Sequence, residues 1–434
     1  MGEFLRAQGV PVTDIFLGDY LSLFDEITPY DLGQAMGRAL AAKQIPTARH
    51  SFNVVLHSTG GLVVREFLRQ FCRDAQGRPQ AALSPIRNIL MLAPANFGSP
   101  IARLGKSMAG RLFKGWKWDG LFQTGAELLH ALEVGSPYGF KLAEADLFDP
   151  AFPIFDPAHV VVTVLVGTNA FSNVLKQIAH VNGSDGTVCV ATASLNARLV
   201  AVDFAAPDAP VITERRCTAP EVALGVFDRD HSTICRPEAK AQQAEWRRLV
   251  LAALTVDAAG YARHVAACAA VTRETFTKGR ARRLIKERRR FHEYQNVVFR
   301  VCDQYGHPIN DYFIEFYQDV GDPRDRVAAK VHGEILEDVK VHTQAANHRS
   351  FYFDITDLRA DQEAHPELSV QFSIVAAHPS ERIRYRNPTE APGVGITVFD
   401  RQRAGLLRPN STLLIDLTLY RDPTDAVFTM KGLD

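Results

Sequence analysis

A serine at the junction between an apolar run and a helical stretch is the first feature of this sequence that can do chemistry. The run FNVVL (52–56) leads into HSTGG (57–61), and an amphipathic stretch follows at once. A serine on such a strand-to-helix turn has a strained backbone, and its hydroxyl stands clear of the sheet. The amide of Thr59 then lies at the start of the helix, where it can stabilise a developing oxyanion. We therefore predict that Ser58 is a nucleophile and that Thr59 supplies one oxyanion donor.

A base and an orienting carboxylate follow later in the chain. A nucleophilic serine needs a general base, and the base needs a carboxylate that orients it. Asp185 lies in VNGSDGTVCV, a short connection beyond an apolar run, and His231 lies in GVFDRDHSTICRP before a helical stretch. Open α/β sheets gather their sites at the carboxyl ends of their strands. We therefore expect Ser58, Asp185 and His231 to meet there as catalytic residues, and this chemistry needs no metal or cofactor.

Each of the three residues also has a purely structural interpretation. The pattern G-x-S-x-G is imperfect, because Leu56 stands where the first glycine is expected. An Asp-Gly pair is usually a turn, and a single histidine is usually a packed core or surface residue. The order serine, aspartate, histidine in these local contexts favours the catalytic interpretation over three coincidences.

The elements that must position these residues alternate along the first 255 residues. Apolar runs that are not interrupted by polar positions are typical of parallel strands covered on both faces by helices. The predicted strands are Val12–Leu17, Phe52–Leu56, Ile86–Leu92 and His159–Val166, and the predicted helices are Pro29–Lys43 with Thr28 as N-cap, Gly60–Phe71 and Ala239–Ala269. This alternation predicts a doubly wound, mostly parallel α/β sheet.

The pattern of residue types along the chain predicts three parts. We predict an α/β catalytic domain over 1–270 with a helical cap insertion at about 101–157, and a basic helical linker over 271–294. Beyond it, short stretches of alternating apolar and polar residues are separated by turn sequences such as DQYGHP and DVGDP. That pattern predicts an antiparallel β-sandwich domain over 295–434.

Four segments together resemble a known family. HSTGGLVVR, MLAPANFGSP, GSDGTVCV and DHSTICRP resemble the bacterial lipase/esterase branch of the α/β-hydrolase superfamily, over about residues 10–250. The resemblance implies a serine hydrolase that cleaves carboxylic esters through an acyl-enzyme. It implies Ser58 as nucleophile, His231 as general base and acid, Asp185 as orienting carboxylate and the Thr59 amide as an oxyanion donor.

One part of the family pattern is missing. In that branch an earlier strand ends in a His-Gly loop that supplies the second oxyanion amide, and no such segment precedes Ser58 here. Either the chain begins after that strand, or Gly18-Asp19 or another loop takes its place. Phospholipases, thioesterases and acyltransferases use the same triad, and a non-catalytic binding protein can be built on the same fold. The sequence does not distinguish among these alternatives.

The amino-acid composition limits the classes of binding partner. Lys and Arg number 49, as do Asp and Glu, so no basic excess points to nucleic acid. The six cysteines lack a C-x-x-C pair, so we expect no metal site. Neither a signal peptide nor a membrane span is seen, so we expect a cytoplasmic protein, with export by a route without a cleaved signal as the alternative. We expect an ester or lipid substrate, and the protein partner of the β-domain is unknown.

Two segments offer surfaces for other contacts. The basic run Lys278–Arg290 is typical either of a solvated linker helix or of a site for an anionic partner. Aromatic and basic residues of the cap offer a membrane-surface contact, and the alternative is a cap whose aromatics pack inward. These cap residues are Arg111, Phe113, Lys114, Trp116, Lys117, Trp118, Leu121 and Phe122.

Overall fold

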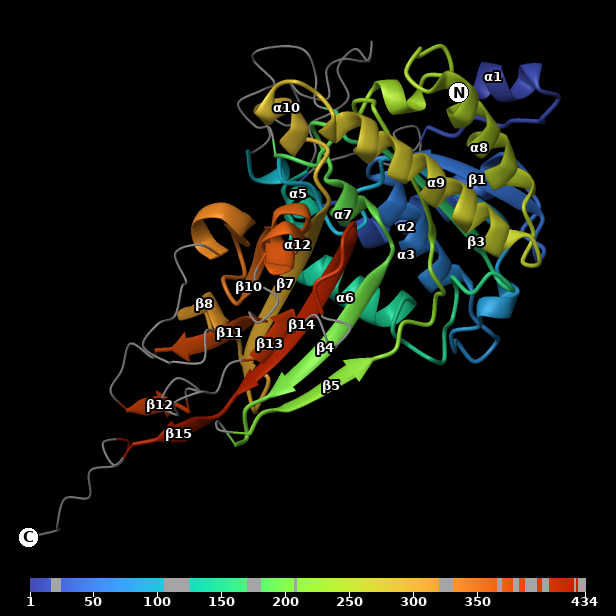
Figure 1. Cartoon of the computed structure of the whole chain (residues 1–434). Coiled ribbons are helices and arrows are strands. Elements are labelled where there is room, and N and C mark those ends of the chain that lie inside the picture. The colour runs from blue at the N-terminus through green and yellow to red at the C-terminus, as the bar shows by residue number, and fades with distance from the viewer. Residues whose placement is uncertain are drawn as a thin grey trace, which may run out of the picture. The chain divides into compact units, whose positions relative to one another are not determined.

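The chain folds into two compact units (Figure 1). The computed structural model describes residues 1–16, 25–104, 125–169, 181–206, 209–319, 331–364, 369–377, 382–386, 396–399, 406–424 and 427. The first unit comprises Met1–Ala197 and Cys217–Glu293, and the second comprises Arg198–Arg216 and Tyr294–Asp434. The chain therefore leaves the first unit, contributes a short segment to the second and returns, which the sequence patterns did not predict.

A four-stranded parallel sheet forms the centre of the first unit. Its strands are β1 (Phe52–His57), β2 (Ile86–Leu92), β3 (Val161–Gly167) and β6 (Ala223–Phe227), in that spatial order. Every residue of β3 is buried, as expected for a strand covered on both faces. Because all four strands are parallel, their carboxyl ends lie along one edge of the sheet.

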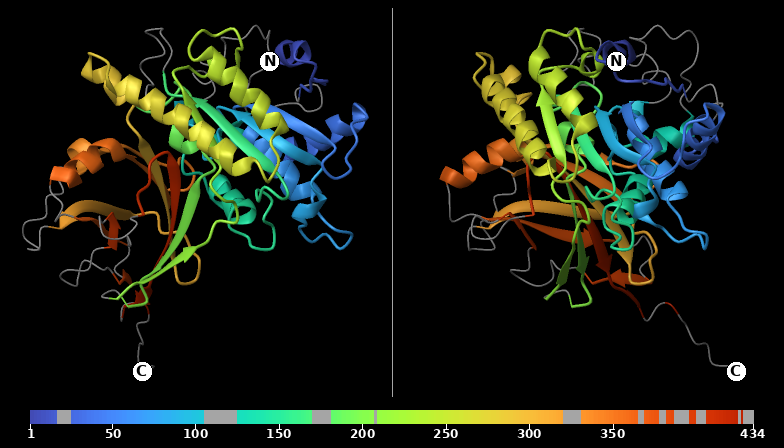
Figure 2. Two further views of the ribbon diagram at one scale, coloured as in Figure 1. Left: turned by 45° about the vertical axis from the view of Figure 1, so that its right-hand side comes forward. Right: turned by 90° about the vertical axis from the view of Figure 1, so that its right-hand side faces the viewer.

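Helices cover both faces of this sheet (Figure 2). On one face lie α2 (Pro29–Ala42), α3 (Gly60–Phe71) and α6 (Pro137–Asp146), and on the other lie α8 (Gln243–Thr255) and α9 (Tyr261–Arg280). The predicted doubly wound α/β architecture is confirmed. The Thr28 N-cap is also present, because its side chain and that of Asp31 form a reciprocal capping box.

Two of the predicted elements differ from the structure. Residues 12–16 have no regular secondary structure, and Leu17 lies outside the described residues, so the predicted first strand is wrong over its described part. Contacts with α1 (Gly2–Ala7) hold this segment instead, since Arg6 pairs with Asp14. The long helix predicted from Ala239 is divided in two, because a turn closed by the Asp257 carboxylate on the Gly260 amide separates α8 from α9.

The predicted cap insertion is described only in part. Its described residues include the helices α5 (Ala126–Leu132) and α6. Residues 105–124, which hold the cap aromatics and basic residues named above, lie outside the described residues. The membrane contact through the cap therefore stays a prediction. No helix in the described ranges combines the length and the apolar character that a membrane crossing requires.

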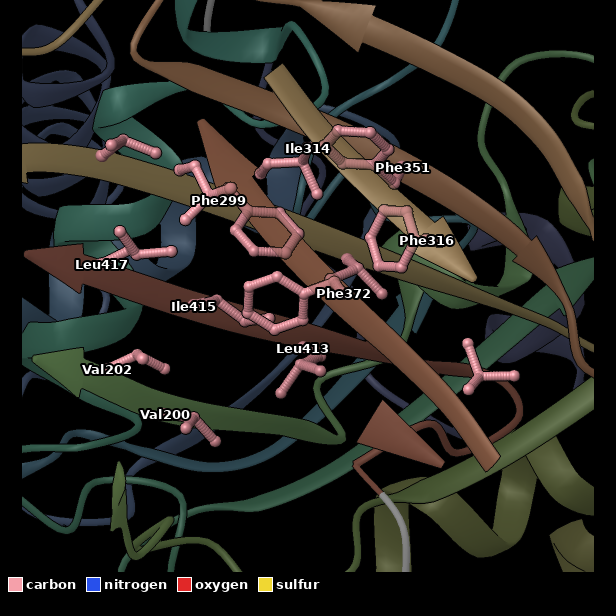
Figure 3. Close-up of a cluster of buried hydrophobic side chains, with 14 of the residues drawn as sticks. Val200, Val202, Phe299, Ile314, Phe316, Phe351, Phe372, Leu413, Ile415 and Leu417 are labelled. Carbon is pink, nitrogen blue, oxygen red and sulfur yellow. The ribbon is translucent and has the colours of Figure 1, made fainter. Parts of the chain in front are cut away.

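The second unit is a sandwich of two sheets around a hydrophobic core of aliphatic and aromatic side chains (Figure 3). The larger sheet has the order β5-β4-β14-β7-β10-β9 and the smaller has the order β13-β11-β8. Their bounds are β4 Ala197–Asp203, β5 Val211–Arg215, β7 Tyr294–Asp303, β8 Tyr312–Asp319, β9 Leu336–Val341, β10 His348–Asp354, β11 Ser369–Ala376, β13 Ile396–Phe399 and β14 Ser411–Leu419. A helix, α12 (Ile355–Ala364), follows β10, and β12 (Ile383–Tyr385) pairs with β15 (Arg421–Pro423).

Tight aromatic packing joins the two sheets. The ring of Phe299 on β7 lies 5.2 Å from that of Phe372 on β11, edge to face, and Phe316 on β8 lies 5.2 Å from Phe351 on β10. The predicted C-terminal β-sandwich is confirmed. It is not wholly antiparallel, because β14 pairs in parallel with β7, and it includes the strands β4 and β5 from the middle of the chain.

Candidate active site

Ser58 occupies a strained turn between β1 and α3. Its φ is +56°, in the left-handed region that residues with a side chain rarely adopt. Hydrogen bonds to the end of β2 and to the segment after it hold this conformation: the Ser58 amide donates to the Leu92 carbonyl at 3.1 Å, and the Ser58 carbonyl accepts from the Ala95 amide at 3.2 Å. The turn therefore has the geometry that sets a serine hydroxyl at the carboxyl edge of a sheet.

The large side chain of Leu56 is accommodated by a glycine on the other side of the turn. A Cβ atom at Gly60 would lie 3.1 Å from the Leu56 Cβ, so the missing side chain leaves room for the leucine. A Cβ at Gly61 would meet Pro94 and Asn96, each at 2.9 Å. The absence of the first glycine of the motif is thus compensated within the turn itself.

Asp185 is a fully buried carboxylate beyond the end of β3. Its Oδ1 accepts hydrogen bonds from the amides of Thr187 at 2.9 Å and Val188 at 2.8 Å. Its Oδ2 lies 2.8 Å from Nδ1 of His231. A buried charge needs such partners, and three donors here replace the water that the carboxylate has lost.

His231 bridges the carboxylate and the hydroxyl. It lies four residues beyond the end of β6, is 3% exposed, and its Nε2 is 3.1 Å from Ser58 Oγ. Because the Asp185 carboxylate only accepts, the imidazole carries its proton on Nδ1 and Nε2 accepts from the serine hydroxyl. The structure therefore brings together Ser58, His231 and Asp185 at one edge of the sheet, and their catalytic roles remain our prediction.

The comparisons with known proteins agree with this architecture. No protein-family model and no curated protein matches the sequence. The structure is similar to that of phospholipase PlaB from Legionella pneumophila, with a TM-score of 0.78 and 23% identity over 99% of this chain and 91% of that chain. A structure of the same phospholipase in complex with thio-NAD gives a TM-score of 0.75 and 23% identity over the same shares. This chain therefore has an α/β-hydrolase fold.

A histidine that the sequence patterns did not single out lies beside His231. His57 immediately precedes Ser58, and its Nε2 is 3.1 Å from the His231 carbonyl oxygen. The two imidazole rings lie 4.5 Å apart. Burial, together with the nearby His231, lowers the pKa of His57 to about 3, so its ring stays neutral and its Nε2–H donates to the carbonyl. The position before the nucleophile was the only signal in the sequence.

The loop that carries His231 is held by a buried arginine. The Arg229 guanidinium packs over the Trp246 ring at 4.9 Å and donates to four main-chain carbonyls. These belong to Thr233, Arg236, Ala239 and Ala241, at 2.9–3.2 Å. Burial lowers the pKa of Arg229 to about 10, which leaves it charged at neutral pH. The arginine, which precedes His231, therefore holds the segment that follows His231.

One predicted oxyanion donor is available. The Thr59 amide precedes the first turn of α3 and makes no hydrogen bond within the described part of the chain. It is therefore available to a negative oxygen near Ser58. Gly18 and Asp19, considered above for the second donor, lie outside the described residues.

Proposed function

We propose that this chain is a serine hydrolase that cleaves a carboxylic ester of a lipid. The observation that carries the proposal is the continuous hydrogen-bond path from Asp185 through His231 to Ser58, with distances of 2.8 and 3.1 Å. An uncharged imidazole nitrogen directed at a serine hydroxyl on a strained turn is the arrangement that acyl transfer requires.

The reaction follows from this geometry. His231 Nε2 takes the proton of Ser58 as Oγ attacks the ester carbonyl carbon, and the Thr59 amide donates to the oxyanion. The alcohol leaves with the proton from Nε2, and the acyl group stays on Ser58. Water, deprotonated by His231, then attacks the acyl carbon. The bond to Oγ breaks, Oγ takes the proton back from Nε2, and the carboxylic acid is released. Asp185 holds the ring and stabilises the imidazolium in both steps.

A glycerophospholipid is the substrate that we favour among lipid esters. The supporting observation is the similarity to phospholipase PlaB over 99% of this chain, which extends through both units. The triad by itself serves triglyceride lipases, thioesterases and acyltransferases equally well. Contact between the cap and a membrane surface is part of the same proposal.

Labelling with a fluorophosphonate tests the mechanism. We expect covalent labelling of the full chain, loss of labelling in Ser58→Ala, and full labelling in the control Ser51→Ala, an exposed serine just before β1. The substrate class is tested by assaying a phospholipid, a triglyceride, a soluble short-chain ester and an acyl thioester side by side. A chain that is not labelled and turns over none of them would be a binding protein on a hydrolase fold.

A further inference from the structure

The turn between α9 and α10 (Ile285–Arg289) presents a leucine among arginines. Leu284 is 61% exposed, and Arg283 and Arg288 are also exposed. We refer to residues 281–288, which span this turn and most of α10, as the basic turn. A solvated linker needs charge but gains nothing from an apolar side chain directed to water, so this combination points to a partner with both apolar and anionic parts.

The basic turn lies on the same edge of the sheet as Ser58. Arg282 forms an ion pair with Asp228, which directly follows β6. At the other end, the Thr168 hydroxyl donates to the Arg290 carbonyl at 2.7 Å, and Thr168 directly follows β3. The segment therefore crosses the carboxyl ends of β3 and β6, the two strands that precede Asp185 and His231.

The base of the turn is held in place. Phe291 is fully buried against Gly279, where a Cβ atom would lie only 1.9 Å from its ring. The Arg282 guanidinium lies 4.4 Å over the same ring. Because the two ends are fixed, the exposed tip is presented without further ordering when a partner binds.

Five of the cationic residues in this run divide into two groups. Lys278, Arg280 and Arg282 form ion pairs with Glu274, Glu293 and Asp228. Arg283 and Arg288 have no carboxylate partner in the part of the chain that the structure describes. The charges at the tip are therefore available to an anion, and those at the base are already neutralised.

We propose that the basic turn docks on an anionic lipid surface, with Leu284 entering the apolar boundary and Arg283 and Arg288 binding headgroup phosphates. The inference rests on the proposed lipolytic function, because it sets the carboxyl edge and Ser58 against the surface that holds the substrate. Nucleic acid offers phosphates as well, but no apolar layer for an exposed leucine.

Vesicle binding tests the proposal apart from turnover. The full chain carrying Ser58→Ala is mixed with phosphatidylglycerol or phosphatidylcholine vesicles, and the bound fraction is measured by sedimentation. We expect binding to the anionic vesicles that weakens with added salt. Each lost arginine lowers the partition coefficient about fivefold, so R283Q/R288Q lowers it about twenty-fivefold. Adding Leu284→Asn lowers it further.

The matched control replaces two arginines and a leucine at the opposite edge of the sheet. Arg49 precedes β1, Leu83 precedes β2, Arg87 lies near the start of β2, and all three are exposed. The variant R49Q/L83N/R87Q should bind as the parent does. Equal binding by the basic-turn variant, no preference for anionic vesicles, or binding of duplex DNA in place of vesicles would overturn the proposal.

A second readout separates this inference from the proposed function. In chains that keep Ser58, both triple variants should hydrolyse a soluble short ester like the parent, since neither set touches the triad. If the parent hydrolyses no ester, the proposed function fails whatever the vesicles show. If soluble-ester turnover is normal and vesicle binding does not depend on the basic turn, only the inference fails.

Discussion

At the scale of single residues, the chemistry that we propose for Ser58 depends on which nitrogen of His231 carries the proton. Asp185 determines this, because its Oδ1 is occupied by two amides and its Oδ2 faces Nδ1. An ionised carboxylate can only accept hydrogen bonds, so Nδ1 must carry the proton. The tautomer in which Nε2 accepts from Ser58 is therefore set by the segment 185–188.

The variant Asp185→Asn tests this dependence. The amide oxygen can keep the two backbone bonds, but its NH₂ group then faces Nδ1, so the proton moves to Nε2 and the imidazole cannot accept from Ser58. We expect kcat for a soluble ester to fall about 10⁴-fold. Asp228→Asn makes the same change on the same sheet edge outside the triad, and should stay within about fivefold of the parent. Equal losses in the two variants would contradict the assignment.

His57 should make the stability of the fold sensitive to acid. Its pKa is lowered from 6.5 to about 3, so the unfolded chain binds a proton between these values that the native ring excludes. This contribution to stability is complete above pH 6.5 and is lost as the pH falls toward 3. The slope reaches about 1.4 kcal/mol per pH unit.

The variant His57→Gln should reduce that slope. Glutamine can donate an N–H to the His231 carbonyl but does not titrate. Urea unfolding at several pH values between 4 and 7 measures the free energy of unfolding. We expect this free energy to fall less steeply with decreasing pH in H57Q than in the parent. The difference in slope should reach at most the contribution of one bound proton, about 1.4 kcal/mol per pH unit. Parallel curves would show that His57 is protonated as easily in the native state as in the unfolded chain.

At the scale of elements, the end of β3 and the segment after β6 must approach very closely. A Cβ atom at Gly167 would lie 2.0 Å from the Arg229 carbonyl oxygen and 3.1 Å from the Asp185 Cβ. The carbonyl belongs to backbone that Arg229 ties down through its four hydrogen bonds, so it has little room to move. The pairing of Asp185 with His231 therefore depends on a glycine at the end of the strand.

The variant Gly167→Ala should damage both stability and turnover. The clash is with backbone, so we expect a loss of about 3 kcal/mol in the free energy of unfolding, with a fall in kcat as His231 moves. Gly225→Ala on the neighbouring strand is the control, because its Cβ would meet the terminal methyl of Leu165 at 2.7 Å, and a side-chain end can shift. It should cost about 1 kcal/mol and leave kcat nearly unchanged. A similar kcat loss in both would contradict the proposed role of Gly167.

At the scale of the whole molecule, the second unit is completed by residues from the middle of the chain. Strands β4 and β5 extend its larger sheet beside β14. Val200, Val202 and Phe204 are buried in its core. The two units are thus joined by three passages of the chain, and the second is not an independent C-terminal domain in sequence.

The fragment 294–434 should accordingly fail to fold by itself. It lacks three buried side chains worth about 5–9 kcal/mol, which is comparable to the whole stability of a domain. We expect no cooperative thermal unfolding by circular dichroism. The control fragment carries 198–216 joined to its N-terminus by a flexible linker and should unfold cooperatively. Cooperative unfolding of 294–434 alone would show that β4 and β5 are dispensable.

The sequence by itself determined those features that depend on neighbouring residues. Helix α3 and strand β2 begin and end at the predicted residues, because the 3.6-residue period and an uninterrupted apolar run are local signals. The chain order of Ser58, Asp185 and His231 was sufficient to nominate them, since parallel strands bring successive loops to one edge.

The tertiary structure decided what depends on residues far apart in the chain. Ser58 and His231 are 173 positions apart, and their 3.1 Å contact exists only when the sheet has assembled. The fit of Leu56 against Gly60, the bond from His57 to His231 and the passage of β4 into the second unit are of the same kind. Local periodicity carries no information about which distant surface an element will meet, because that choice is made by the burial and hydrogen bonding of the whole chain at once.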